Sequence, residues 1–558
     1  MSIALQPRSV LRTHTVENQP LPLGAYNAYR CDTALQEAVE REGAAWATPE
    51  LLALGEAVGD PANVDQATLA NLHSPTLKRF DPAGRRVDQV EFHPAWHHIM
   101  GMAWRHGLPT GPWTDPRTGA HVAKAAKTIL FNELEGGCMC PVAITYGGVP
   151  MLRIQPDISA LWEPQLLSTA YDGRPLPVAQ KTGATAAFAA TEKQGGSDMR
   201  SNATTATPVG TPGPGREYLL TGHKWWVSSA GADVIMVSAR TDKGVSVFAV
   251  PRWLPDGTRN AINIERIKDK MGNRANPSVE MEFDKAHGWM VGEDGRGIAN
   301  MMIFMQYSRF EVSMMPVGEM RLTLTQAIHH ARQRSAFGKA LIHQPLMKNV
   351  LADMALEYEA SLALSMRIAR SLDGAAQDDG HRAFARLVVA IAKYWHCKRA
   401  VPFVQEAMEV HGAAGYVEES VMPRFYREAP VNNIWEGSGN VICLDILRAL
   451  QKDPLAKEVL FAQLQLARGG NAHLDRAMDG LPSVLAAATA NEAHARRLAQ
   501  QLALCLQGGL LVRHAPAGVA DAFCASRFGP EGAGFFGTLP EGVDFDAILA
   551  RTMAGELA

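Results

Sequence analysis

The feature that most constrains the fold of this 558-residue chain is a change of residue pattern near residues 183 and 292. Between these points the sequence falls into short runs rich in Val, Ile, Tyr and Trp, the residues that favour β-strands. No helical segments alternate with the runs, so the pattern predicts an antiparallel β-domain rather than a parallel βαβ sheet. The expected strands are Thr204–Val209, Tyr218–Ser228, Val234–Ala239, Val245–Val250, Ile262–Ile267 and Ser278–Phe283.

The segments on both sides of this region are helical in pattern. Pro345–Asp373 and Arg382–Glu409 carry apolar residues at helical spacing, which is typical of a four-helix bundle, with a kink or break expected at Pro402. Helices are also expected over Thr33–Glu42, Pro49–Ala57, Pro94–Arg105, Pro454–Arg468 and Ser483–Val512.

The fold class that follows is α+β and multidomain. It has an N-terminal helical domain (1–182), an antiparallel β-domain (183–293), a four-helix bundle (294–450) and an extra C-terminal helical domain (451–558).

The stretch 409–440, EVHGAAGYVEESVMPRFYREAPVNNIWEGSGN, places a carboxylate, Glu436, between Trp435 and Gly437. Burial beside a large aromatic ring raises a carboxyl pKa toward neutrality, and a glycine lets the backbone approach a substrate closely. These are properties of a catalytic base. The alternative is an ordinary helix-turn-helix whose Glu436 is a solvated surface acid, and this stretch alone does not decide between the two.

A second candidate segment, 191–198, reads TEKQGGSD. Its two glycines expose backbone N–H groups, Thr191 and Ser197 add hydroxyl donors, and Lys193 adds a cation. Such a loop suits a phosphate or the edge of a flavin ring, although a Gly-Gly-Ser-Asp turn by itself is usually only a turn.

Together, and in this order, the two segments resemble the two signatures of the acyl-CoA dehydrogenase family. Three further segments, 220–233, 269–283 and 331–346, are similar to other parts of the same family. The resemblance implies an acyl-CoA dehydrogenase-like fold and bound FAD, with Arg334 and Phe337 reaching the FAD of a neighbouring subunit. The other implied FAD-binding residues are Thr191, Lys193, Gly195, Gly196, Ser197, Trp226, Val227, Ser228, Trp435, Gly437, Ser438 and Asn440.

The resemblance also implies the reaction. Glu436 would remove the α-proton of an acyl thioester while the β-hydrogen leaves as hydride to flavin N5, next to the Ser228 hydroxyl. Some members of the family place the base immediately before an arginine on an earlier helix. That position here is Ser308, before Arg309, so Glu436 is the candidate base.

Within the family, the N-terminal phrases, the VNNIWEGSGN segment and the C-terminal extension resemble the AidB branch, which is linked to the DNA alkylation response. This resemblance implies a homotetramer and, as an alternative function, binding of double-stranded DNA with little acyl-CoA turnover. Arg448, Lys452, Arg496 and Arg497 are the candidate DNA contacts. The charge argues against this alternative, since residues 450–558 hold nine Lys and Arg against eleven Asp and Glu.

Composition excludes several other classes. The 54 basic and 57 acidic residues give a net charge of −3, without a general attraction to nucleic acid or membranes, and no long apolar run occurs. The seven scattered cysteines indicate reduced thiols in a cytoplasmic protein. His93, His97 and His98 lack a partner cluster, so no metal site is expected.

Overall fold

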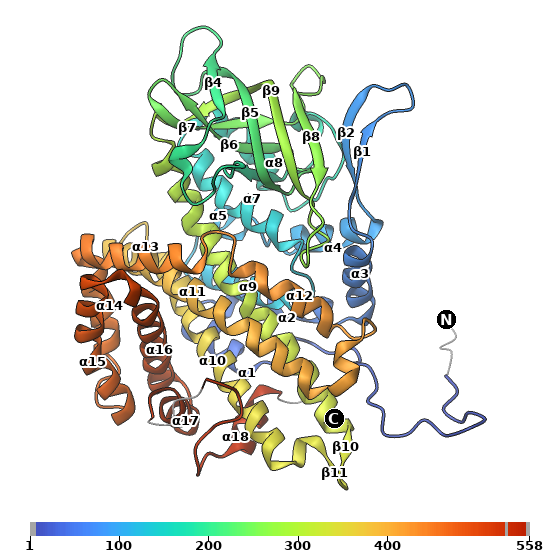
Figure 1. The fold of residues 1–558 in the computed structure, drawn as a ribbon, viewed down its shortest axis with the longest axis vertical. Helices are drawn as coiled ribbons and strands as arrows, with labels where there is room; N and C mark the ends of the chain where they lie inside the picture. Colours follow the sequence, from blue (N-terminus) through green and yellow to red (C-terminus); the bar gives the residue numbers. More distant parts are fainter. Residues whose placement is uncertain (1–6, 530–533, 554–558) are drawn as a thin grey trace.

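The β region forms one seven-stranded sheet above a body of helices in the computed structural model, which describes residues 7–529 and 534–553 (Figure 1). The strand order is β3-β6-β4-β5-β9-β7, with β8 on β9, and further β6–β7 pairing closes a ring that leaves few free edges. The strands are β3 (Ala186–Ala189), β4 (Thr205–Pro208), β5 (Glu217–Ser228), β6 (Val234–Thr241), β7 (Gly244–Pro251), β8 (Ile262–Ile267) and β9 (Ser278–Val291).

The six expected strands are confirmed, and two features differ from the expectation. β9 continues to Val291, and β3 is an additional strand that pairs in parallel with β6. Because β3 reads AAFA, it lacks the β-branched residues that mark a strand in the sequence. The sheet is therefore mixed, although most of its pairs are antiparallel.

The N-terminal part is helical, with one β-hairpin that the sequence pattern did not indicate, β1 (Thr76–Phe80) and β2 (Arg86–Glu91). Pro94–Arg105 forms α4 as expected. The other helices of this part are α1 (Thr33–Arg41), α2 (Thr48–Val58), α3 (Pro61–Leu72), α5 (Gly111–Thr114), α6 (Ala120–Asn132), α7 (Met139–Leu152) and α8 (Pro156–Leu166).

Long helices below the sheet build the bundle (Figure 1). α9, α10 and α11 pack along one another, and α12 and α13 lie against α11. α11 begins at an Asp378 cap, whose carboxylate accepts from the His381 N–H, and passes Pro402 without ending. These helices are α9 (Gly297–Gln333), α10 (Pro345–Gly374), α11 (Asp379–Val410), α12 (Met422–Asn432) and α13 (Gly439–Lys452).

The C-terminal helices pack onto this bundle rather than forming a separate tail (Figure 1). Arg527 donates to Asp353 at 2.7 Å and to Glu357 at 3.1 Å, with all three side chains buried. The expected helix Ser483–Val512 is two helices, separated at Asn491–His494. The helices are α14 (Pro454–Gln465), α15 (Ala472–Ala490), α16 (Ala495–His514), α17 (Ala517–Phe528) and α18 (Phe545–Thr552). Across the described residues, no helix has the length and apolarity needed to cross a membrane.

Candidate functional site

Glu436 lies in the short turn between α12 and α13, where the backbone adopts an unusual conformation. Its φ is +55° and that of Gly437 is +107°, so a side-chain-bearing residue sits in the left-handed region. Two buried cations hold the turn: Arg309 Nε donates to the Glu436 carbonyl at 2.9 Å, and Lys393 Nζ to the Gly437 carbonyl at 2.5 Å. Strain of this kind persists where surrounding contacts over-determine it, which is common at functional sites.

The residues just before Glu436 are fixed by a second set of hydrogen bonds. Trp435 Nε1 donates to Asn432 Oδ1 at 3.1 Å, and Asn432 Nδ2 donates to the buried Glu319 at 2.7 Å. Asn433 Nδ2 donates to the Cys397 carbonyl at 2.8 Å. The base of the turn is therefore anchored to α9 and α11, which fixes the direction of the Glu436 side chain.

The Glu436 carboxylate is sheltered and partly uncommitted. Its Oε2 atom is buried and has no hydrogen-bond partner among the described residues. Burial raises the pKa of the Glu436 carboxyl, while Arg309, the Ser308 hydroxyl and Lys393 act in the opposite direction. A carboxylate with a raised pKa and a free oxygen can accept a proton from a bound molecule.

The facing wall is the end of β5, with Trp226, Val227 and Ser228. The buried Cys140 thiol at the start of α7 connects the two walls, since both Ser228 and Glu436 lie close enough to influence its pKa. Trp226 is 44% exposed. The end of β5 and the Glu436 turn, more than two hundred positions apart in the sequence, thus both lie near Cys140.

The 191–198 loop is pinned beside β5 by a fully buried ion pair. Lys224 Nζ lies 2.7 Å from Glu192, whose carboxylate also accepts the Ala203 N–H at 2.6 Å and the Thr204 N–H at 3.1 Å. The Trp225 N–H donates to the Thr191 carbonyl at 2.8 Å. Apart from buried Glu192, the residues of this loop face outward at least in part, and they include the expected Lys193, Gly195, Gly196 and Ser197.

Two expected residues lie far from the turn. Arg334 follows the end of α9, and at 1.5 Å per residue it is about 39 Å along that helix from Ser308. Phe337, at the tip of the hairpin β10 (Ser335–Ala336) and β11 (Lys339–Ala340), is 99% exposed. Neither residue joins the Glu436 site within one chain.

The start of α13 holds the last expected residues. Ser438 precedes the helix as its N-cap residue, and Asn440 Oδ1 accepts a hydrogen bond from Arg496 Nε at 2.8 Å. Arg496, expected at a nucleic-acid surface, therefore lies at the edge of the candidate site. Lys393 of α11 was not among the expected site residues. Its hydrogen bond to the Gly437 carbonyl joins residues 44 positions apart, and no motif around Lys393 indicates it.

The described residues fit a flat, phosphate-bearing flavin. The half-exposed Trp226 ring and the Ser228 hydroxyl supply a stacking surface and a polar contact opposite Glu436. Gly196 and Ser197 supply backbone and hydroxyl donors for phosphate. No group of acidic, histidine or cysteine side chains within 7–529 and 534–553 is arranged to hold a metal ion, and each of the seven cysteines is a buried free thiol.

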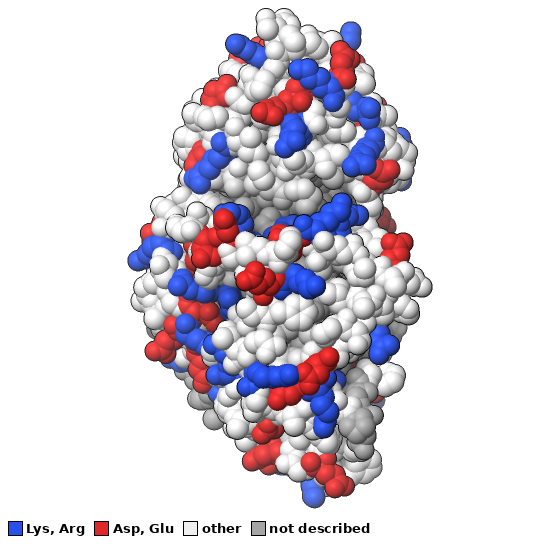
Figure 2. Space-filling model, turned by 90° about the vertical axis from the view of Figure 1, so that its left-hand side faces the viewer, with Lys and Arg blue, Asp and Glu red and all other residues white. Residues whose placement is uncertain are grey.

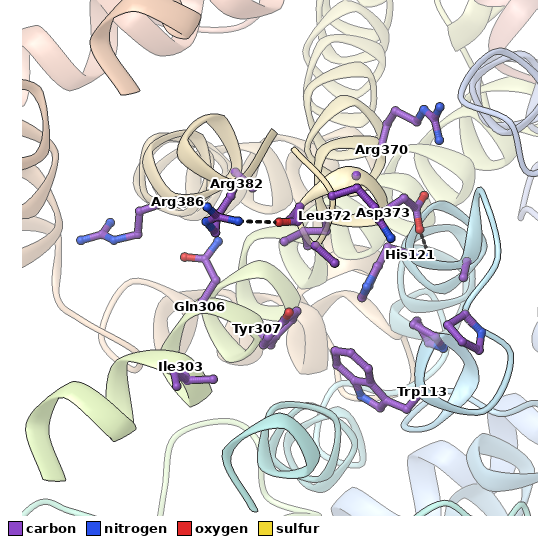
Figure 3. A pocket seen from close by; sticks show the side chains of 18 of the residues that line it. Trp113, His121, Ile303, Gln306, Tyr307, Arg370, Leu372, Asp373, Arg382 and Arg386 are labelled. Atoms are coloured by element: carbon purple, nitrogen blue, oxygen red, sulfur yellow. Dashed lines mark hydrogen bonds between the residues drawn. The ribbon is translucent and has the colours of Figure 1, made fainter. Parts of the chain in front are cut away.

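A cavity of about 870 Å³ opens on the other side of the Arg309 anchor. Arg386 on its wall binds Asp445 at 2.8 Å, and Asp445 binds Arg309 at 3.0 Å. Figure 3 shows Arg382 and Gln306 on one side of the view and Asp373, His121 and Trp113 on the other. The lining carries five arginines and one acid, Asp373; the arginines are Arg117, Arg153, Arg370, Arg382 and Arg386.

The floor of the cavity is aromatic. Trp113 stacks on Tyr146 at 5.2 Å and meets Tyr307 edge-on at 5.1 Å, and the Tyr146 hydroxyl lies 2.6 Å from His121 Nδ1. Burial raises the pKa of Asp373 to about 6, so this acid is still mostly ionised at pH 7 and offsets one of the five arginine charges. The cavity therefore suits an anionic ligand.

Comparison with known proteins gives three family matches along the chain. Residues 18–173 match the adaptive response protein AidB N-terminal domain, 187–286 the acyl-CoA dehydrogenase middle domain, and 295–451 the acyl-CoA dehydrogenase C-terminal domain. A putative acyl-CoA dehydrogenase, AidB of Escherichia coli K12, is 42% identical over 97% of this chain and 98% of its own length.

Two solved structures are similar over most of their length. Caenorhabditis elegans ACDH-11 in complex with C11-CoA has a TM-score of 0.83 at 25% identity, covering 95% of each chain. The apo form of Bd2924 has a TM-score of 0.81 at 28% identity, covering 89% of this chain and 99% of its own.

Proposed function

Since the chain belongs to the acyl-CoA dehydrogenase family, in its AidB branch, we propose that it oxidises an acyl-CoA thioester to the 2-enoyl product, with Glu436 as the base. One observation carries the proposal. The buried Oε2 atom of Glu436 has no partner among the described residues. Leaving such an oxygen unpaired costs free energy, which a bound substrate would offset by presenting a proton to it.

FAD is the cofactor of this family. Trp226, Val227 and Ser228 would hold its ring, and bound FAD would accept the hydride that leaves the substrate β-carbon. Thr191, Lys193, Gly195, Gly196 and Ser197 would bind its polar part from one side, and Trp435, Gly437, Ser438 and Asn440 from the other.

Arg334 and Phe337 would complete the cofactor site of a second copy. Their distance from Ser308 along α9 and the full exposure of Phe337 support this role. The protein would then be a homotetramer, as the family resemblance implies, and it would act in the cytoplasm.

The proton chemistry belongs to Glu436. Its Oε2 takes the proton from the substrate α-carbon, and the electron pair of that C–H bond forms the new Cα–Cβ double bond. Arg309 and Lys393 hold the turn through its carbonyls, so the carboxylate keeps its position as its charge changes. Ser308 lies on α9 close to Glu436. Its side chain is a hydroxyl, which does not act as the base.

The arginine-lined cavity supports a CoA ester as the substrate class. CoA carries several phosphate charges, and Arg370 lines the cavity near Asp373, whose pKa it lowers, without a hydrogen bond or ion pair to any described residue, so it is available to an anion. The Arg386–Asp445–Arg309 row connects the cavity wall to the Glu436 turn. We place the phosphates of CoA in this cavity and the thioester at Glu436.

The test is anaerobic reduction of the bound flavin. The purified protein should be yellow with non-covalent FAD, and at least one member of a panel of acyl-CoAs should bleach it. The N-acetylcysteamine thioester of the same acyl group, which lacks the phosphates, should require a much higher concentration. A protein that stays colourless after FAD is added would refute the proposal.

A second candidate function, duplex DNA binding, is favoured by the AidB relationship and by four exposed cations. Arg448 and Lys452 lie on the second half of α13, and Arg496 and Arg497 lie at the start of α16, which packs against α13. On the face shown in Figure 2, basic side chains border the hollow between the two halves of the molecule, but acidic side chains are interspersed with them. We therefore propose weak binding that is not sequence-specific.

DNA binding should depend on these cations and on salt. Replacing Arg448, Lys452 and Arg497 together by Ala should lower affinity for duplex DNA at 50 mM salt, with a smaller salt slope, because each lost phosphate contact removes about one released counterion. Titration at two salt concentrations measures both effects, and Lys243→Ala on the β-domain is the control. If the triple variant binds DNA as tightly as the unmodified protein, the DNA site lies elsewhere on the surface. If the unmodified protein does not bind duplex DNA, this second function is refuted.

A further inference from the structure

A partly buried lysine behind the flavin wall, Lys270, forms no ion pair with an acid among the described residues. Lys270 follows β8, and burial lowers its pKa to about 8, so its ammonium is still mostly charged at pH 7. Three lysines that are buried, Lys124, Lys181 and Lys224, each pair with a carboxylate at 2.5–2.7 Å. Lys270 instead donates to the Asn276 carbonyl at 2.5 Å and to the Ser278 hydroxyl at 3.1 Å.

The contacts of Lys270 continue to the candidate flavin site. Ser278, buried at the first position of β9, lies opposite Ser228 of β5, and their hydroxyl oxygens are 3.1 Å apart. Ser228 is the polar residue of the wall that faces Glu436. A row of three polar groups thus runs from Lys270 Nζ through Ser278 Oγ to Ser228 Oγ.

The chemistry of these groups sets the direction of the row. An ammonium donates only, so Ser278 must accept from Lys270. The single hydrogen of Ser278 is then free for Ser228, and Ser228, having accepted, directs its own hydrogen away from β9. The Cys140 thiol is the neighbouring acceptor, but burial raises its pKa to about 12, so it stays a weakly accepting thiol.

We propose that Lys270 is a positioning residue for the cofactor: through Ser278 it makes Ser228 a hydrogen-bond donor to the electron-rich edge of the bound flavin. The inference rests on the proposed flavin function and deepens it. A donor backed by a buried positive charge stabilises the reduced flavin, which is richer in electrons, more than the oxidised one. Lys270 would thereby raise the reduction potential of the cofactor.

The same loop explains how the cation is kept in place. Asn276 accepts the Ser229 N–H at 3.1 Å and donates to Asn273 at 2.9 Å, and Asn273 in turn holds Glu428 by two hydrogen bonds. The charged groups around Lys270 are Glu135, Glu428 and Arg274, and neither carboxylate forms an ion pair with it. The charge of Lys270 is therefore left to act along the serine row.

The test measures the midpoint potential of bound FAD by reductive titration, which needs no acyl-CoA. Lys270→Met, Ser278→Ala and the double variant should each bind the reduced flavin at least tenfold more weakly relative to the oxidised flavin, a shift of about −30 mV for a two-electron couple. Because the groups act in series, the double variant should shift no further than Lys270→Met alone. Lys243→Met, an exposed turn lysine of the same domain, is the control.

Unchanged potentials in variants that bind FAD would overturn the proposal, as would additive shifts. If Lys270→Met fails to fold or to bind FAD, Ser278→Ala decides alone, since it removes one hydroxyl and keeps the cation. A colourless unmodified protein would instead refute the flavin function itself, so the two failures are distinguishable.

Discussion

Replacing Glu436 by Gln should strongly slow reduction of the flavin by acyl-CoA while FAD stays bound. The amide keeps the shape of the side chain and loses the base, and the carbonyls of the turn still accept from Arg309 and Lys393. A positioned general base contributes about 10²–10⁴ in rate, so the variant should be slower by that factor. Stopped-flow bleaching of the flavin under anaerobic conditions measures this directly.

The matched control is Glu419→Gln, an exposed acid of the same segment, which should reduce its flavin at the normal rate. In the unmodified protein the rate should rise with pH through the raised pKa of Glu436, because only the ionised carboxylate accepts the proton. That rise should be absent from the residual rate of Glu436→Gln. If the variant retains full reduction, another group is the base.

Secondary structure was predictable from the sequence where the local residue pattern agrees with the burial of the side chains. The strands Tyr218–Ser228 and Ile262–Ile267 and the helix Pro94–Arg105 have dense periodic patterns, and the structure confirms them within one residue. β3 was not predicted because alanine has a low preference for strands, so its sequence AAFA becomes a strand only through tertiary packing. The break at Asn491 was missed because apolar spacing continues on both sides, although an Asn at a helix start is a capping signal.

The candidate site was predictable only in its individual segments. The Glu436 turn and the 191–198 loop each carry a residue pattern, and the structure places them against the same strand region. Which partners hold them was not predictable, because Arg309 and Lys393 reach the turn, and Lys224 the loop, from elements remote in sequence. Arg496 is a similar case, since its position beside Asn440 depends on how α16 packs against α13.

Removing the cation of the buried Lys224–Glu192 pair should destabilise the β-domain and loosen the 191–198 loop. Both side chains are fully buried and 2.7 Å apart. Lys224→Met leaves Glu192 as an unpaired buried charge, and breaking such a pair costs about 3–5 kcal/mol. The apoprotein should show lower thermal and urea midpoints, and FAD affinity should fall because Thr191 and Gly196 lose their anchored backbone.

The pH dependence identifies the cause of that loss. Burial would raise the pKa of Glu192, but the Ala203 N–H and Lys224 outweigh it and lower the pKa to about 2. The stabilisation from ionised Glu192 is thus present above its ordinary pKa of 4.5 and is lost as the pH falls toward 2. The stability gap between Lys224→Met and the unmodified protein should therefore narrow from pH 5 downward.

A double variant separates the ion pair from simple packing. Adding Glu192→Gln to Lys224→Met removes the orphaned charge, so it should recover part of the lost stability, even though Glu192→Gln alone destabilises. Lys243→Met controls for the loss of a surface lysine in the same domain. If the two changes instead add, the buried charges act independently and the anchoring of the 191–198 loop does not depend on their pairing.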